Sequence, residues 1–280
     1  MTDVTKGAQR ASGQRSMRLV VAVMAAMLAI SGLAASPPSA AAVVAPKVVF
    51  IVGPMGSMTA GLKDQSDRLA ATARSYGATV TRIYSPNATW ARVKREAQGA
   101  KLLVYMGHGN GWPSPYKPFQ PYTKDGLGLN KSAFNGNSNL KYWGEYYLRR
   151  DLHLAANAVV ILNHLCYASG KSEPGRADPT KSVAKQRVDN YGAGFLRTGA
   201  RAVFAEAHSS IQYILYGLFK TDQTVSQIFW SGPSTRTYAF GFASSRTAGM
   251  RALMDPYRPS KYYRSVIGNL DLTAATWRSD

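Results

Sequence analysis

The chain contains the stretch Leu102-Leu103-Val104-Tyr105-Met106-Gly107-His108-Gly109, an apolar run that ends in a histidine between two glycines. It also contains a second apolar run, Ala158-Val159-Val160-Ile161-Leu162-Asn163, which is followed closely by Cys166, the single cysteine of the chain. Continuous apolar runs of this length are typical of strands that are buried on both faces of a parallel sheet. The carboxyl ends of such strands lie along one edge of the sheet, where catalytic groups collect. We therefore expect the imidazole of His108 and the thiol of Cys166 to lie near one another.

The residues around these two runs predict alternating strands and helices. Strands are expected at residues 47–52, 78–83, 100–106, 158–163 and 201–205, with a last strand within 262–273. Helices are expected at 59–76, 89–98, 143–154, 183–198, 210–219 and 224–229, and loops at 110–139 and 169–180. This order predicts an α/β fold, a three-layer sandwich with a mostly parallel central sheet and helices on both faces.

The first 42 residues have the layout of a secretory signal peptide rather than of a folded segment. Four basic residues precede the apolar stretch Leu19–Leu33, and Ala40-Ala41-Ala42 offers a small-residue cleavage site. We expect residues 43–280 to form a single domain that is secreted or associated with the cell envelope. An uncleaved membrane anchor is the alternative, although the apolar core is shorter than the roughly 20 residues that span a bilayer.

The chain is strongly basic, with 34 Lys and Arg against 15 Asp and Glu and a formal net charge of +19. Without residues 1–42 it keeps 30 basic and 14 acidic residues, a net charge of +16. Such a charge attracts anionic surfaces, including the polymers of a cell envelope. The basic residues are dispersed and match no nucleic-acid-binding motif, so a specific nucleic-acid partner is not expected.

A lone thiol in an exported chain cannot form an internal disulfide, and three uses of Cys166 remain open. The first is a nucleophile activated by a nearby base, the second a small hydrophobic residue buried in the core, and the third a metal ligand. His164 and Cys166 supply only two ligands, and His108 and His208 would be needed to complete a four-ligand zinc site. No metal-binding or cofactor-binding motif is present, so neither a metal nor a cofactor is expected.

The two strand ends resemble those of cysteine peptidases with a caspase-like fold (clan CD), such as gingipains, metacaspases and legumains. In those families one apolar strand ends in His-Gly, and a later one ends at the catalytic cysteine, often with Ser-Gly soon after. Here the matching residues are His108-Gly109 and Cys166 followed by Ser169-Gly170, within a resemblance that covers roughly residues 47–205. The pair His164-Leu165 before the cysteine departs from the family pattern.

The resemblance implies a hydrolase, a thiol protease that cleaves peptide bonds in a peptide or protein substrate through a thioester intermediate. His108 would be the general base and acid, and Cys166 the nucleophile. The backbone N–H groups of Gly109 and Cys166 would form the oxyanion hole. The alternative is a catalytically inactive surface protein of the same fold that binds anionic cell-envelope polymers.

Three other residues are candidates for lining the site. His164 directly precedes the nucleophile turn, and His208 follows the strand expected at 201–205. Trp112 belongs to an aromatic cluster after His108 that either lines a substrate subsite or anchors the loop. His164 is also open to a structural role, as a hydrogen-bonded residue near the core.

Overall fold

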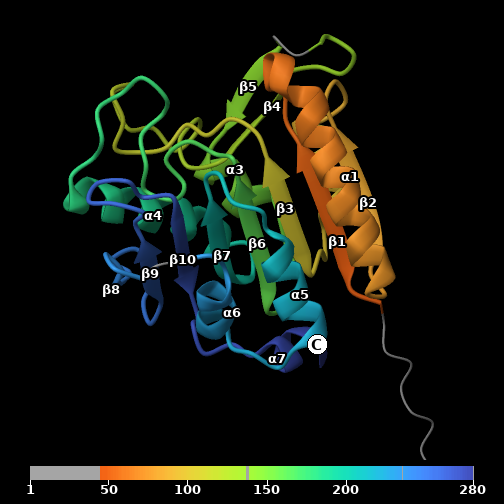
Figure 1. The fold of residues 1–280 in the computed structure, drawn as a ribbon. Coiled ribbons are helices and arrows are strands. Elements are labelled where there is room, and N and C mark those ends of the chain that lie inside the picture. The colour runs from red at the N-terminus through yellow and green to blue at the C-terminus, as the bar shows by residue number, and fades with distance from the viewer. Residues whose placement is uncertain (1–44, 137–138, 235, 280) are drawn as a thin grey trace, which may run out of the picture. The chain divides into compact units, whose positions relative to one another are not determined.

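The computed structural model describes residues 45–136, 139–234 and 236–279 (Figure 1). Within them, one sheet has the strand order β2-β1-β3-β6-β7-β10-β9-β8. Its strands are β1 (Lys47–Val52), β2 (Thr79–Tyr84), β3 (Leu102–Met106), β6 (Ala158–Asn163), β7 (Ala200–Glu206), β8 (Phe240–Ala243), β9 (Arg251–Asp255) and β10 (Arg264–Gly268). The first five in the spatial order are parallel to one another, whereas β10, β9 and β8 each run antiparallel to the preceding strand. The predicted α/β class and mostly parallel sheet are confirmed.

Helices cover both faces of this sheet, which makes the three layers expected from the sequence. They are α1 (Thr59–Ser75), α2 (Trp90–Glu96), α3 (Glu145–Asp151), α4 (Lys181–Leu196), α5 (Gln212–Lys220), α6 (Val225–Ser231) and α7 (Ala274–Ser279), with a 3₁₀ turn at Gly56–Met58. Successive side chains of a strand point to opposite faces. Accordingly, Val48 and Phe50 belong to one apolar core with α1, α5, α6 and α7, while Val49 and Ile51 belong to a second core with α2, α3 and α4. Figure 1 shows α1 and α5 on the same face of the sheet.

Local residues set two of the helix ends. Thr89 caps α2, because its hydroxyl accepts a hydrogen bond from the backbone N–H of Arg92. Gly199 has a φ of +103° between α4 and β7, a left-handed conformation that glycine adopts without the strain a side chain would bring.

The segment expected to be a loop at 110–139 contains a strand, so that prediction is wrong in part. The strand β4 (Leu127–Asn130) pairs antiparallel with β5 (Leu140–Trp143) to form a small second sheet. The helix expected at 143–154 is correspondingly shorter. It begins at Glu145, because Gly144 before it is extended, and it ends at Asp151, because Leu152 after it is extended.

The antiparallel part of the sheet, which lies beside β7 and is formed by the last strands of the chain, is larger than predicted. The expected last strand is β10, but β8 and β9 were not predicted. β8 forms an edge of the sheet, and its Phe240 and Phe242 lie beneath lysines of α4. The ammonium of Lys181 lies 4.0 Å from the ring centroid of Phe240, and that of Lys185 lies 5.2 Å from that of Phe242.

The predicted signal peptide, residues 1–42, lies outside the described residues. Its cleavage and the single domain of residues 43–280 therefore stay predictions. Across the described ranges, none of the helices combines the length and the apolarity needed to cross a membrane.

Candidate active site

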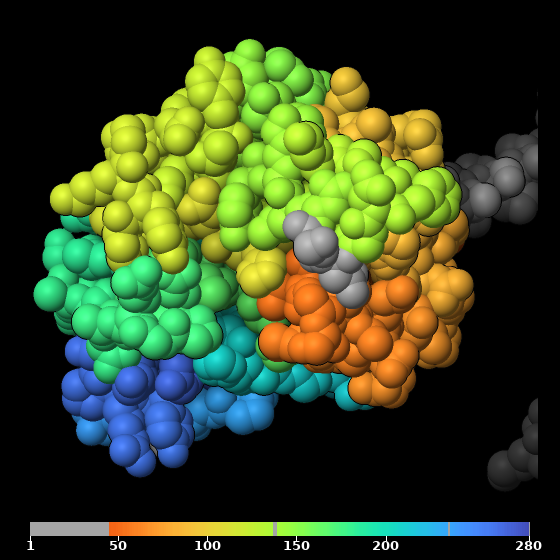
Figure 2. All heavy atoms as spheres, turned by 90° about the horizontal axis from the view of Figure 1, so that it is seen from above, coloured from red at the N-terminus to blue at the C-terminus, as the bar shows by residue number. Residues whose placement is uncertain are grey.

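The strands β3 and β6 are parallel neighbours, and their last residues, Met106 and Asn163, are paired in the register. His108 and Cys166 therefore follow adjacent strands at the same edge of the sheet, as predicted. The next strand, β7, pairs with β6 through Glu206 opposite Asn163, so His208 reaches this edge as well. Figure 2 looks down on this edge and shows a hollow where differently coloured parts of the chain meet.

The loops after β3 and β6 are in direct backbone contact. A Cβ atom added to Gly109 would lie 2.2 Å from the carbonyl oxygen of Cys166 and 2.8 Å from the hydroxyl oxygen of Tyr191. Real Cβ atoms do not approach other atoms so closely, so only glycine lets the two loops meet in this way. Gly111 is under the same restriction, since its Cβ would lie 2.3 Å from the Cβ of Tyr167. The glycines around His108 thus serve to bring its loop against the cysteine loop.

The backbone of His108 is held in place by the hydroxyl of Tyr105, a fully buried residue of β3. This hydroxyl accepts a hydrogen bond from the N–H of Gly128 at 2.9 Å. Its own proton points toward two carbonyl oxygens, that of Gly128 at 2.7 Å and that of His108 at 3.0 Å. The strand β4 and the His108 loop are therefore linked through one side chain of the central sheet. Burial raises the pKa of Tyr105 well above its ordinary value, so the hydroxyl keeps its proton.

His108 and Cys166 are both half-buried, and burial favours the neutral form of each. Burial lowers the pKa of His108. Burial also raises the pKa of the Cys166 thiol, while the ammonium of Lys171 acts in the opposite direction and the carboxylate of Glu173 adds to the rise. No hydrogen bond joins the thiol to the His108 ring, although both residues are described. Burial thus shifts each of the two groups toward its neutral form.

The two backbone donors expected to form an oxyanion hole have no acceptor among the residues that the structure describes. Neither the N–H of Gly109 nor that of Cys166 donates a hydrogen bond to another residue that the structure describes. Most buried backbone N–H groups in proteins are paired, so two free donors on adjacent loops are unusual.

His164 and His208 are both connected with β7, and Lys171 contacts His208. The Nζ of Lys171 lies 3.1 Å from Nε2 of His208. His164 is half-buried, and its backbone N–H donates to the carbonyl oxygen of Glu206 at 2.9 Å. Burial and the charge of Lys171 lower the pKa of His164, which a hydrogen bond with the backbone of Ala207 raises in part. His164 thus combines the hydrogen-bonded position expected of a structural residue with a place beside the site.

Trp112 is tied into its loop by its backbone. Its N–H donates to Oδ1 of Asp125 at 3.0 Å, and its carbonyl oxygen accepts from Nδ2 of Asn190 at 2.7 Å. The ring packs on Phe119 with centroids 6.0 Å apart. These contacts hold the backbone of Trp112 in its loop, and its two expected roles, lining a subsite or anchoring the loop, stay predictions.

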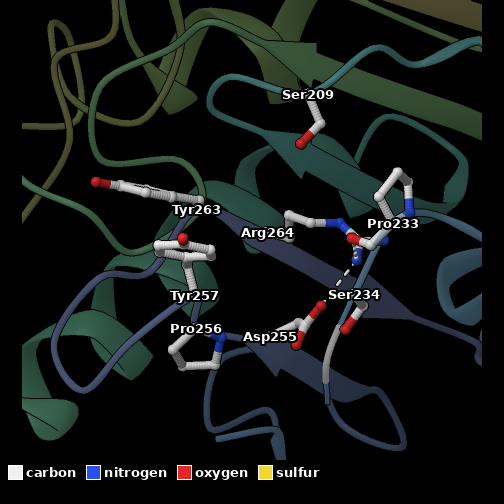
Figure 3. A pocket seen from close by; sticks show the side chains of 8 residues that line it. All are labelled: Ser209, Pro233, Ser234, Asp255, Pro256, Tyr257, Tyr263 and Arg264. Atoms are coloured by element: carbon white, nitrogen blue, oxygen red, sulfur yellow. Dashed lines mark hydrogen bonds and ion pairs between the residues drawn. The ribbon is translucent and has the colours of Figure 1, made fainter. Parts of the chain in front are cut away.

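Two cavities lie beside these residues, and both are lined by Tyr263. The first has a volume of about 410 Å³ (Figure 3). Figure 3 shows the rings of Tyr257 and Tyr263 at one side of it and the Arg264–Asp255 ion pair below. The second, of about 260 Å³, is lined by the 171–176 loop, Asp178, His208 and residues 260, 261 and 263. Of the predicted site residues only His208 lines one of these two cavities; His108, Cys166, His164 and Trp112 line neither.

The residues of this edge form no metal site in the structure. Among the described parts of the chain, no three His, Cys, Asp or Glu side chains are grouped closely enough to hold a metal ion. His108, His164, His208 and Cys166 therefore do not come together as the four-ligand site considered above.

Comparison with known proteins leaves the family open. No protein-family model matches the sequence, and no curated protein matches it. Among solved structures, the chain is similar to "iotapain", a secreted C11 cysteine protease from Bacteroides thetaiotaomicron, with 13% sequence identity and a TM-score of 0.35. A secreted C11 cysteine protease from the same organism, in complex with an irreversible peptide inhibitor, gives 11% and 0.36.

Each of these two matches covers 75% of this chain and 66% of the other chain, which is slightly less than two thirds of its length. Because this similarity is low, the function has to be argued from the residues of the chain itself.

Two residues of the site were not recognised from the sequence. Tyr105 looked like one apolar residue of a buried strand, and nothing local indicates that its hydroxyl supports His108. Lys171 lies in Ser169-Gly170-Lys171-Ser172, which fails as a phosphate-binding loop because Leu165 stands where the motif needs glycine. Its position next to His208 depends on a loop that follows a different strand.

Proposed function

We propose that this protein is an exported cysteine peptidase in which Cys166 is the nucleophile and His108 the general base. The observation that carries the proposal is the direct backbone contact between the His108-Gly109 loop and the Cys166 loop, at the ends of adjacent parallel strands. This contact between the two loops supports the proposal that the thiol, the imidazole and the N–H groups of Gly109 and Cys166 act on the same substrate bond. A structural thiol would need none of the other three groups.

Because burial favours the neutral form of both groups, the proposed mechanism moves the proton as the bond forms. His108 takes the thiol proton while the sulfur of Cys166 attacks the carbonyl carbon of the scissile peptide bond. The carbonyl oxygen becomes an oxyanion and accepts hydrogen bonds from the N–H groups of Gly109 and Cys166, each worth a few kcal/mol in a transition state. The C–N bond then breaks, His108 protonates the leaving amine, and a thioester remains on the sulfur.

Hydrolysis of the thioester repeats the proton transfer with water. His108 takes a proton from a water molecule as its oxygen attacks the thioester carbon. The C–S bond breaks, and the thiol of Cys166 is restored when His108 returns the proton to sulfur. Burial of the thiol raises its pKa, so before substrate binds the thiol is less reactive than an exposed one.

The test is covalent labelling and peptide hydrolysis with the wild-type protein and two variants. A peptide carrying a thiol-reactive ketone should label the wild-type protein at Cys166, and Cys166→Ala should remove both labelling and hydrolysis. His108→Ala should slow hydrolysis at least about 100-fold, the usual contribution of a general base. Unchanged labelling with His108→Ala, together with no hydrolysis by the wild-type protein, would instead favour an inactive surface protein that binds anionic envelope polymers.

The location outside the cytoplasm is part of the same proposal and rests on the first 42 residues. Sequencing of the amino terminus of the secreted protein tests it, and the expected result is a mature chain that begins near residue 43.

A further inference from the structure

The cavity of about 260 Å³ has an unequal distribution of charge. It contains two ion pairs, Arg176 with Glu173 at 3.2 Å and Lys261 with Asp178 at 2.7 Å. Lys171 is the remaining cationic side chain of the lining, and it has no carboxylate partner among the described residues. The cavity therefore carries one positive charge that no carboxylate of the described residues balances.

The arrangement around Lys171 leaves this charge open to a ligand. Its ammonium is half-buried, and the only hydrogen-bond partner that the described residues give it is Nε2 of His208. That contact requires a neutral His208, since the nitrogen must accept the bond. The ring of His208 stands edge-on to Tyr263, with centroids 4.7 Å apart, and so faces the same cavity. Two of the three ammonium protons remain for an incoming acceptor.

We propose that Lys171 and His208 form a subsite that binds a carboxylate of the substrate beside the bond that Cys166 attacks. The inference deepens the proposed peptidase function and rests on it. Lys171 follows the nucleophile by five positions, beyond the turn at residues 166–169, and His208 follows β7, the strand next to β6. The carboxylate is either an acidic side chain within the peptide or the free carboxylate at its carboxyl terminus.

The electrostatics of the group agree with a missing anion. Burial lowers the pKa of Lys171, and burial and Lys171 together lower the pKa of His208. A carboxylate in the cavity would reverse both effects, because it stabilises the charged form of each base.

The neighbouring cavity of about 410 Å³ does not offer a binding site for a basic side chain of the substrate. Its buried acid Asp255 accepts from Nη1 of Arg264 at 2.7 Å, and Glu206 accepts from Nε of the same side chain at 3.0 Å. The cationic partner of these carboxylates is thus part of the protein. A basic substrate side chain would have to displace it.

The test compares peptides that differ by one charge. Peptides with Asp, Asn or Arg before the cleaved bond are assayed for kcat/KM, each with a free or an amidated carboxyl terminus. We expect about a 10-fold preference for Asp over Asn, or for the free acid over the amide, which is the range of a charge-assisted hydrogen bond. The pair that shows the preference identifies the source of the carboxylate.

Lys171→Met should abolish this preference, whereas Lys261→Met, in the same cavity but already paired, should retain it. The charge of Lys171 also affects the thiol, so Lys171→Met will slow all peptides. The ratio of the rates for Asp and Asn peptides removes that common effect. Equal rates for the charged and neutral peptides, a preference for Arg, or an unchanged ratio with Lys171→Met would each overturn the proposal.

Binding to the Cys166→Ala variant separates this proposal from the proposed function. Calorimetric titration of that variant with the Asp and Asn peptides needs no catalysis. Tighter binding of the charged peptide, lost with Lys171→Met, supports the subsite even if no peptide is hydrolysed. Equal binding of both peptides refutes it even if the protein is an active peptidase.

Discussion

Tyr105→Phe tests how the His108 loop is held in place. The substitution removes one oxygen atom from a fully buried side chain and leaves the ring in the core. Three backbone groups lose a partner: the N–H of Gly128, its carbonyl oxygen, and the carbonyl oxygen of His108. Phenylalanine has the same ring and offers no replacement for these bonds.

The size of the effect follows from the burial of these groups. A buried N–H left without an acceptor costs about 1–3 kcal/mol, and the two carbonyl oxygens share a single lost proton. We expect the free energy of unfolding to fall by about 2 kcal/mol. For a domain of this size that corresponds to a melting temperature about 4–8 °C lower. Because the His108 loop is also released, kcat/KM should fall roughly 10-fold as the general base moves from its position.

The assay is urea unfolding monitored by fluorescence, combined with peptide hydrolysis. Tyr216→Phe is the control, because that tyrosine is 54% exposed and its substitution should change neither quantity. A loss of stability below about 0.5 kcal/mol with unchanged hydrolysis would refute the claim that this hydroxyl supports His108.

Three further predictions follow from the same geometry. Gly109→Ala should lower kcat/KM and cost about 1–3 kcal/mol of stability, because its Cβ would lie 2.2 Å from the carbonyl oxygen of Cys166; a stable and fully active variant in urea and hydrolysis assays would contradict the contact. Arg264→Met should lower the free energy of unfolding by about 3–5 kcal/mol, since it leaves two buried carboxylates unpaired, whereas Arg251→Met at an exposed ion pair should cost less than about 1 kcal/mol in the same urea experiment. Burial lowers the pKa of His108 below its ordinary value of 6.5, so the base stays neutral somewhat below pH 6.5. We expect kcat/KM to be retained there and to be lost only as pH falls through the lowered pKa. A measured kcat/KM that already decreases while the pH is being lowered toward 7 would be inconsistent with this prediction.

The sequence predicted the parts of the fold that depend on local pattern. The strands β1, β3 and β6 are continuous apolar runs, and such runs identify a buried strand without knowledge of its neighbours. Their order along the chain, with helices between them, was enough to place His108 and Cys166 at one sheet edge. The catalytic roles of these two residues stay predictions.

The parts that were missed depend on contacts between distant segments. The strand β4 has only four residues, includes a glycine, and is stabilised by pairing with β5 and by the hydroxyl of Tyr105. The role of Lys171 was missed for the same reason, because it depends on the contact with His208 and on the ion pairs of the other charged residues in the cavity. No local pattern reports either arrangement.

The edge strand β8 has a consequence for how the protein behaves in concentrated solution. An unprotected edge with two phenylalanines invites another copy to add a strand and begin an aggregate. Lys181 and Lys185 hold their positive charges over these rings, so a second copy approaching in this way would meet like charge. Part of the basic character of the chain thus protects this edge, and acetylation of those two amines would remove the protection.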